Sequence, residues 1–342
     1  MARRNVNIKD VAARAKVHPS TVSRVLNTET RAMVSTAVAD RVSRIAAEMG
    51  YARSSLAYGL RTGRTHTIGV VIPDLTNPLF PPIIRQIGRT LADHGYITIL
   101  ADSDNDHETE TAIVQSLMSR HVDGLILATA HRQDSVVSTC VEEQIPLVLV
   151  NRNIDTHSVT AVVNDDEYGI ELAVAHLVGL GHKSIAYLGG PQDTSTGHER
   201  YRAFKKLVRI GKFQTHDDLV LNCDAFTETE GRKGFLSILD KRRKFTAVVA
   251  ANDLLALGCY DAIAEFGLKC PADISVTGFS DMPFMHRLSP PLTTLRIPHD
   301  EIGRQAARLL LERILDPEAK VRSVNLLPEL IVRGSTASPK NK

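Results

Sequence analysis

Residues 7–26 read NIKDVAARAKVHPSTVSRVL, and this stretch decides how the first part of the chain folds. Its first half repeats apolar side chains at helical spacing, which predicts a helix whose buried face is Ile8, Val11, Ala12 and Ala15. Asn7 suits the N-cap of this helix, and Asp10 suits the positive end of its dipole. Pro19 fits the first turn of a second helix, whose apolar face would be Val22, Val25 and Leu26. Two short helices with a tight turn predict a helix-turn-helix, whose second helix enters the DNA major groove.

A third helix is expected after Val34, with Ser35 as its cap and Gly50 at its end. The alternative interpretation is a small three-helix bundle whose basic face only contacts water. Charge argues against that alternative, because residues 1–64 hold 12 Lys and Arg against 4 Asp and Glu, whereas the other 278 residues hold 29 against 35. A basic head on an acidic body indicates that the head binds a polyanion.

Size and composition exclude several classes of protein. At 342 residues, with 43% hydrophobic and 23% charged residues, the chain suits two or three soluble domains. It has no apolar run long enough for a transmembrane helix and starts without a signal-peptide core, so we expect a cytoplasmic protein. The four cysteines form no CxxC pair, which predicts buried thiols and no metal or cofactor site: Cys140, Cys223, Cys259 and Cys270.

The acidic body alternates strand-like apolar runs with helical stretches. Such alternation predicts βαβ units and parallel sheets covered by helices on both faces. The length fits two sheets, with a break near residues 161–164. The predicted strands include 68–72, 97–101, 125–128, 147–150, 185–188, 247–250 and 274–277.

Four segments of the chain carry a resemblance to a known family. Residues 8–15 (IKDVAARA), 20–27 (STVSRVLN), Val34-Ser35 and Met49-Gly-Tyr51 resemble the head of the lactose/galactose repressor (LacI/GalR) family, and the similarity continues through almost the whole chain. The resemblance implies an all-α helix-turn-helix head plus an α/β periplasmic-binding-protein type 1 body of two doubly wound parallel-sheet lobes. It places the head at 1–52, a hinge helix at 53–64 and the body at 65–342. The N-lobe would comprise 65–163 and 296–323, and the C-lobe 164–292 and 327–338.

The same resemblance implies which residues contact DNA. Pro19 and Ser20 would select operator bases, and His18 stands where a Ser or Thr cap is usual. In the hinge, Leu60 would enter the minor groove; the alternative for this segment is a flexible linker. Ser54 replaces the usual hinge asparagine. The complete expected set is Ile8, His18, Pro19, Ser20, Thr21, Ser23, Arg24, Asn27, Ser35, Ser54, Ala57 and Leu60.

An effector site is expected in the cleft between the lobes, since open α/β sheets bind ligands beyond the carboxyl ends of their strands. Phe80 and Phe226 would sandwich a ring, and Arg200 would hold oxygen acceptors. Asp253 is expected to act as a helix cap rather than as a ligand contact. The expected set is Leu79, Phe80, Asp102, Thr129, Asn151, Thr196, Arg200, Phe226, Asn252, Ser280 and Asp281.

The charge of the effector stays open at this point. Ser280 departs from the acidic residue that well-known sugar and purine binders of the family carry, which removes one acceptor for a hydroxyl. Arg152, His198 and Arg200 together would favour an anionic effector such as a sugar acid or sugar phosphate. A neutral sugar is the alternative.

The prediction for function is a homodimeric DNA-binding transcriptional regulator, a repressor, that binds a pseudo-palindromic operator under the control of a small-molecule effector. The rival hypotheses are a sugar-binding transport protein and a regulator controlled by a partner protein. An enzyme is not expected, because no catalytic motif is present and Gly179–Ser184 lacks the spacing of a phosphate-binding loop.

Overall fold

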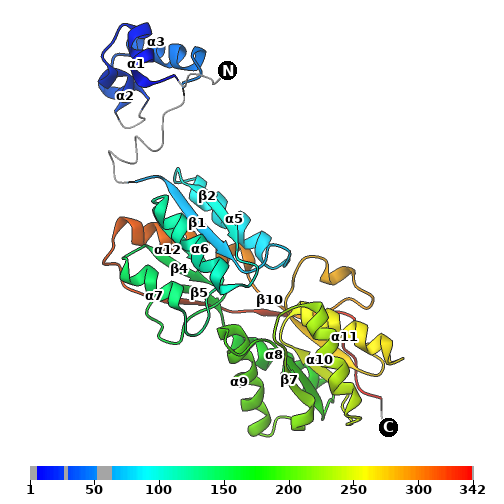
Figure 1. Cartoon of the computed structure of the whole chain (residues 1–342). Helices are drawn as coiled ribbons and strands as arrows, with labels where there is room; N and C mark the ends of the chain where they lie inside the picture. Colours follow the sequence, from blue (N-terminus) through cyan, green and yellow to red (C-terminus); the bar gives the residue numbers. More distant parts are fainter. Residues whose placement is uncertain (1–5, 27–29, 52–63, 341–342) are drawn as a thin grey trace. The chain divides into compact units, whose positions relative to one another are not determined.

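The computed structural model describes residues 6–26, 30–51 and 64–340. The chain divides into two compact units, Met1–Thr65 and His66–Lys342, which we call the head and the body and describe separately (Figure 1). The predicted hinge positions Ser54, Ala57 and Leu60 lie outside the described residues, and so does Asn27.

The head is a three-helix unit, comprising α1 (Ile8–Ala15), α2 (Pro19–Val25) and α3 (Thr36–Glu48), with a short 3-10 turn η1 (Arg31–Met33) before α3. The predicted cap of α1 is confirmed: the Asn7 side chain accepts from the N–H of Asp10, whose carboxylate accepts from the N–H of Asn7. Gly50 follows α3 with a φ of 63°, as expected of a residue that ends a helix. Ser35 occupies the N-cap of α3 but makes no side-chain capping bond. The interior is formed by apolar residues of all three helices, with Val11, Val22 and Val42 fully buried.

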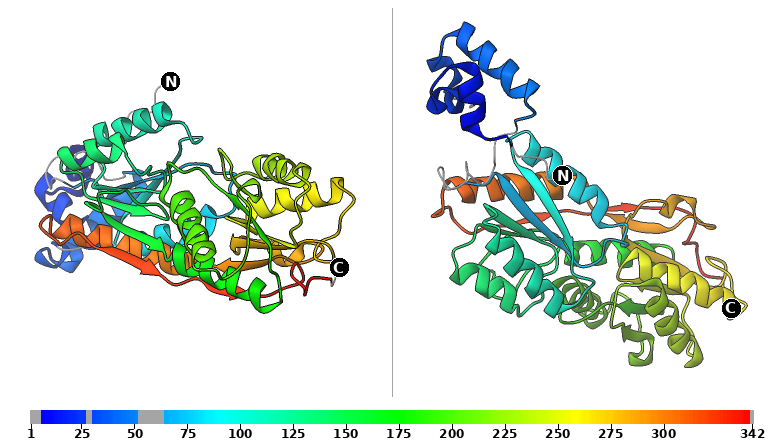
Figure 2. Two further views of the ribbon diagram at one scale, coloured as in Figure 1. Left: turned by 90° about the horizontal axis from the view of Figure 1, so that it is seen from below. Right: turned by 45° about the horizontal axis from the view of Figure 1, so that its top comes forward.

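The first lobe of the body is a parallel six-stranded sheet in the order β11-β5-β4-β3-β1-β2. Successive residues of β3 and β4 face opposite sides of this sheet, because side chains alternate along a strand. One face is covered by α5 and α12 and the other by α6 and α7 (Figure 2). The elements are β1 (Thr67–Ile72), α5 (Phe80–Ala92), β2 (Ile97–Asp102), α6 (His107–Ser119), β3 (Gly124–Leu127), α7 (Ser135–Glu142), β4 (Leu147–Val150), β5 (Thr160–Asn164), α12 (His299–Leu315) and β11 (Ser323–Leu326).

The second lobe holds a sheet in the order β12-β10-β9-β8-β6-β7. Five strands are parallel, but the edge strand β12 runs antiparallel to β10, a detail that the sequence analysis did not include. The elements are α8 (Asp166–Gly179), β6 (Ile185–Gly189), α9 (Ser195–Arg209), η2 (Asp217–Leu219), β7 (Val220–Asn222), α10 (Glu228–Asp240), β8 (Ala247–Ala250), α11 (Asp253–Glu265), β9 (Ser275–Ser280), η3 (Met285–Arg287), β10 (Thr293–Arg296) and β12 (Glu329–Ile331).

The chain passes between the lobes three times. It leaves the first sheet after β5, returns from β10 into α12, and crosses again between β11 and β12. In this arrangement α12 packs against α5 in the first lobe, and β12 pairs with β10 in the second. Three crossings leave the carboxyl ends of both parallel sheets facing a shared cleft, which is where α/β sheets bind ligands.

Two minor predictions concern the body. Gly179 is the last residue of α8, and Gly181 follows it with a φ of 97°, so Gly179–Ser184 is a helix end before β6 rather than a phosphate loop. Four free thiols are present; Cys140, Cys223 and Cys259 are buried and Cys270 is half-buried. Within the described ranges, no helix is both long and apolar enough to span a membrane.

Candidate functional sites

The first candidate site is the N-terminal end of α2. Val22 and Val25 point into the head, whereas Ser20 and Arg24 are exposed. His18 caps the helix, because its Nδ1 accepts from the N–H of Ser20 at 3.2 Å and lies 2.8 Å from the Ser20 hydroxyl. The imidazole therefore fills the capping role for which a Ser or Thr is usual. The result is an ordered, exposed helix N-terminus that presents Pro19, Ser20 and Thr21.

The remaining expected DNA contacts of the head differ in exposure. Ser35 is exposed, Ser23 is half-buried, and Ile8 packs partly against the apolar interior of the head. Arg31 is engaged, since it donates to Asp40 and Ser43. Five other basic side chains are exposed and form no ion pair with any residue that the structure describes: Lys9, Lys16, Arg24, Arg41 and Arg44. These cations suit contacts to phosphates, which supply most of the affinity of a protein for DNA.

The second candidate site is a cavity of about 220 Å³ between the two lobes of the body. Polar groups from the strand ends of both sheets line it together with two phenylalanines. It brings together nine of the eleven residues that the sequence analysis singled out: Leu79, Phe80, Thr129, Asn151, Thr196, Arg200, Phe226, Asn252 and Ser280.

Asp102 and Asp281 do not line this cavity, and each has other partners. The exposed carboxylate of Asp102 accepts from the N–H groups of Leu75 and Asp104 at 2.8 and 2.9 Å, which stabilises the loop after β2. Asp281 forms ion pairs with Arg296 at 2.8 Å and Arg333 at 2.7 Å. Burial acts to raise the pKa of Asp281, but its hydrogen bonds to the two arginines outweigh burial and hold the pKa below the ordinary value. Its charge is thus already compensated within the protein.

Asp253 also differs from expectation, because Asn252 is the cap of α11 and accepts from the N–H of Leu255 at 2.8 Å. The carboxylate of Asp253 is fully buried and accepts from the Thr294 hydroxyl at 2.5 Å and the N–H of Met282 at 2.8 Å. Burial raises the pKa of Asp253 to about 6.

Four of the helices that begin at the cavity are capped by side chains of residues in its lining. Asp106 caps α6, Thr194 caps α9, Thr227 caps α10 and Asn252 caps α11, and all four capping residues line the cavity. The N-terminus of a helix carries partial positive charge and unpaired N–H groups, so it favours acceptors and negative charge nearby.

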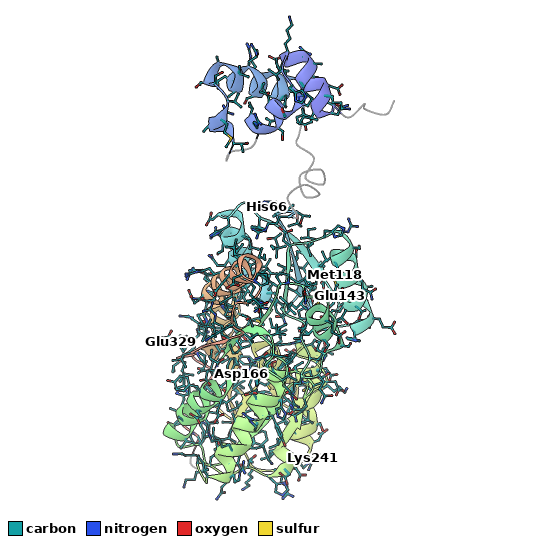
Figure 3. All side chains as sticks on the ribbon, turned by 90° about the vertical axis from the view of Figure 1, so that its left-hand side faces the viewer. His66, Met118, Glu143, Asp166, Lys241 and Glu329 are labelled. Carbon is teal, nitrogen blue, oxygen red and sulfur yellow. The ribbon has the colours of Figure 1, made fainter. Side chains whose placement is uncertain are left out.

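Arg200 lies in the wall formed by the second lobe and is held from three sides. Its Nε and Nη2 both lie 2.8 Å from Oδ1 of Asp166, and its Nη1 donates to the carbonyl of Ala251 at 2.6 Å. The guanidinium carbon stands 3.8 Å from the centre of the Phe279 ring. Burial raises the pKa of Asp166 to about 6, against the opposing influence of Arg200. In Figure 3, Asp166 lies between the level of Met118 in the first lobe and that of Lys241 in the second.

Arg152 lies in the wall formed by the first lobe and has fewer hydrogen-bond partners than Arg200. Its side chain makes one hydrogen bond to a described residue, from Nη1 to the carbonyl of Thr129 at 3.1 Å, and its Nε has no partner there. Burial lowers the pKa of Arg152 to about 10. Nearby, the buried Glu110 accepts from the Thr129 hydroxyl, and burial raises the pKa of Glu110.

The two aromatic side chains come from different lobes. Phe80 is buried at the first turn of α5, and Phe226 is half-buried in the loop before α10. The ring of Phe226 packs onto Gly190, where an added Cβ would lie only 2.2 Å from ring atoms. A glycine is therefore needed at 190 for this ring to lie against the cavity.

The sequence analysis missed Glu110, which lines the cavity, and Asp166, which pairs with the cavity residue Arg200. The signal was present in the helical pattern, because each acid occupies the buried face of its helix. Glu110 precedes Val114 and Leu117 by four and seven residues, and Asp166 precedes Ile170 by four. An acid at such a position is costly to bury unless it is paired, so it marks a polar site.

Comparison with known proteins finds family matches in both units of the chain. Residues 7–54 match the family described as "Bacterial regulatory proteins, lacI family", and residues 174–336 match a "Periplasmic binding protein-like domain". The chain is 32% identical to the HTH-type transcriptional repressor CytR of Escherichia coli (strain K12), with 96% of each chain covered. The chain belongs to the lacI family of bacterial regulatory proteins. It is a DNA-binding transcriptional regulator, and the predicted family and two-part fold are confirmed.

Two further lacI-family relatives extend the comparison. The ribose operon repressor of Escherichia coli (strain K12) is 31% identical, covering 96% of this chain and 99% of that protein. The structure of the lac repressor dimer bound to operator and the anti-inducer ONPF superposes with a TM-score of 0.86 at 27% identity, covering 98% of this chain and all of that one. The curated relatives named here are regulators and not enzymes.

Proposed function

We propose that this protein is a homodimeric repressor that binds a pseudo-palindromic operator. A small sugar-like effector bound in the cleft would control its affinity for that operator. The observation that carries this proposal is the cavity itself, which both lobes line with polar groups and two aromatic rings. Three chain segments connect the lobes, and the linker to the head starts at the first lobe. A ligand that changes the angle between the lobes therefore also changes the orientation of the first lobe. Effector and DNA are then coupled, and each alters the affinity for the other.

The proposal extends to individual residues. Pro19 and Ser20 select bases, the free cations of the head contact phosphates, and residues 53–64, outside the described part of the chain, form the hinge. Phe80 and Phe226 hold a ring in the cleft, while Arg200 and Asn252 contact its oxygens. Because the target is chromosomal DNA, the protein acts in the cytoplasm, and it regulates without catalysing a reaction.

A homodimer is supported by an apolar surface on the first lobe. The edge strand β2 exposes Ile97, Ile99 and Leu100, and Ile97 is 65% accessible. Exposed apolar side chains on a sheet edge are typical of a surface that pairs with another chain. The lac repressor, which is similar over nearly the full length, binds its operator as a dimer.

The test selects operator sequences from a random DNA pool with the full chain and then measures affinity against salt. We expect the logarithm of the affinity to fall steeply with the logarithm of salt concentration, and Arg24→Gln to reduce the slope by about one. Arg120→Gln, an exposed arginine of the body, is the matched control and leaves the slope unchanged. A transport protein would show no salt-dependent DNA affinity, and that result would overturn the proposal.

Control by an effector has its own test. Phe226→Ala removes a ring from the cavity wall of the body and leaves the sequence of the head unchanged. We expect this variant to bind the operator as the wild type does and to lose the response to the effector. A response of wild-type size would contradict the placement of the effector site.

A further inference from the structure

The cavity holds two buried arginines, and only one of them has a buried anion of its own. Arg200 shares two contacts with Asp166, whereas no carboxylate among the described residues lies within ion-pair distance of Arg152. Arg152 is 8% exposed; the charges of Asp193 and Glu110 favour its ionised form from beyond ion-pair distance, and the charge of Arg200 opposes it. A buried cation without a partner anion is costly, so such a group is retained where a ligand completes it.

The carboxylates around the cavity do not fill this role. Asp74 and Asp106 accept from backbone N–H groups of their own loops, at Thr76 and Thr109. Glu110 is bonded to Thr129. The two others lie at the rim: Asp193 pairs with His131, and Asp224 is exposed to solvent.

At the end of β9, the opposite wall presents a hydroxyl and not a carboxylate. Ser280, at the end of β9, is 4% exposed and lines the cavity with a hydroxyl. The neighbouring Asp281 is tied to Arg296 and Arg333, so it is not free to replace a carboxylate there. The positive ends of α6, α9, α10 and α11 surround the same space, which further favours negative charge in the ligand.

We propose that the effector carries an anionic group, a carboxylate or a phosphate, and that Arg152 holds this group. The inference rests on the proposed function, since it names the chemical class of the ligand of that same cavity. The guanidinium plane of an arginine matches either oxyanion through paired N–H donors. Arg200, with its Asp166 partner, is left to contact the neutral oxygens of the ligand.

The experiment compares matched ligands on the full chain by thermal unfolding. The pairs are D-gluconate with D-glucose, D-galacturonate with D-galactose, and D-ribose 5-phosphate with D-ribose, at constant ionic strength. We expect an acid to raise Tm by several degrees where its neutral partner does not, and the pair that responds separates carboxylate from phosphate. Stabilisation by neutral sugars alone, or by no acid in the panel, overturns the inference.

Three variants identify the residue. Arg152→Gln should weaken binding of the active acid by about 10- to 100-fold, as expected for lost hydrogen bonds to a charged group. Arg152→Lys should retain part of the affinity because it keeps the charge, and Arg120→Gln should retain all of it. Equal acid affinity in Arg152→Gln and wild type would refute the role of Arg152, and the ligand-free Tm shows whether the variant folds.

Operator binding separates this inference from the proposed function. An acid that raises Tm and leaves operator affinity unchanged supports the anionic subsite but contradicts effector control. A neutral sugar that releases or strengthens operator binding, with no acid active, supports effector control and refutes the anionic subsite.

Discussion

Each lobe forms one wall of the cleft, and each wall buries one arginine. In the second lobe, Arg200 is bonded to Asp166 and to the carbonyl of Ala251, and it stacks on Phe279. In the first lobe, Arg152 makes one side-chain hydrogen bond to the described residues, to a carbonyl. The buried arginine thus has a full set of partners in the wall of the second lobe and only one hydrogen bond in the wall of the first.

The difference separates a preformed wall from one that a ligand completes. A guanidinium fixed by a carboxylate, a carbonyl and a ring keeps its geometry whether or not a ligand is present, which lowers the entropic cost of binding. A buried cation without a partner makes the empty state less stable and the liganded state more favourable. The binding energy at Arg152 is therefore available to drive a change in the angle between the lobes.

The largest expected effect is a loss of stability when the ion pair in the wall of the second lobe is removed. Arg200→Met leaves Asp166 buried without its cation, which costs about 3–5 kcal/mol of unfolding free energy. At roughly 2–4 °C per kcal/mol for a unit of this size, Tm should fall by about 10 °C. Arg152→Met is the matched variant in the other wall, and we expect its ligand-free Tm to equal or exceed that of the wild type.

A double variant tests the cause of this loss. Replacing Asp166 by Leu in the Arg200→Met background removes the unpaired carboxylate and should recover much of the stability, as a double-mutant cycle measures. Equal losses in Arg200→Met and Arg152→Met would abolish the contrast between the walls.

The next largest expected effect is a pH dependence of stability, caused by the buried Asp253 of the second lobe. Burial raises its pKa to about 6 from an ordinary 3.8, so folding disfavours the carboxylate form and favours the protonated form. The contribution of Asp253 to stability therefore rises as pH falls from 7 through 6 towards 4. A shift of this size corresponds to about 3 kcal/mol.

Asp253→Asn removes this titration. The difference in unfolding free energy between wild type and variant, measured in urea at pH 7.5 and pH 5, should move in favour of the wild type at the lower pH. Other titrating groups cancel in that difference. A difference that does not change with pH would contradict the raised pKa of this carboxyl group.

Several elements of the fold follow from the sequence because their causes are local. The cap of α1 needs only Asn7 and Asp10, three residues apart, and the ends of β1, β4 and β8 follow their apolar runs. Nine expected residues meet at the cavity for a topological reason, since the ends of parallel strands share one edge of a sheet. The head motif and the sheet pattern were thus readable without any long-range contact.

The side chains that the sequence placed differently depend on distant partners. Asp281 follows a strand end as a ligand residue would, but Arg296 and Arg333 reach it from 15 and 52 positions away. The roles of Glu110 and Arg152 likewise arise from contacts with Thr129 across neighbouring strand ends. No local pattern specifies that Asp102 accepts from the N–H groups of two loops or that Asp281 pairs with two distant arginines, and this is why both were expected in the cavity.

The smallest expected effect concerns the mouth of the cleft, where the two walls touch directly. His131 of the first lobe lies 3.1 Å from Asp193 of the second, and the N–H of Arg132 donates to the carbonyl of Asp193 at 2.8 Å. The side chains of His131 and Asp193 are 34% and 65% exposed, and such pairs contribute about 0–1 kcal/mol. Asp193→Asn keeps the backbone bond, so we expect at most a fivefold loss of affinity for the most stabilising ligand of the panel and an unchanged ligand-free Tm.

Asp155→Asn is the matched control for this variant. Asp155 pairs with Arg132 at 2.9 Å within the first lobe and is 46% exposed. Arg132 also donates to the carbonyl of Gln192 in the second lobe at 3.3 Å, a bond that Asp155→Asn does not remove. If the bridge across the mouth holds the lobes together around the ligand, ligand dissociation should be faster in Asp193→Asn and unchanged in Asp155→Asn, and salt should reduce the difference. Equal dissociation rates in the two variants would mean that the ion pair across the mouth does not hold the lobes around the ligand, and that the backbone bond from Arg132, the ligand and the chain crossings are enough to join the walls.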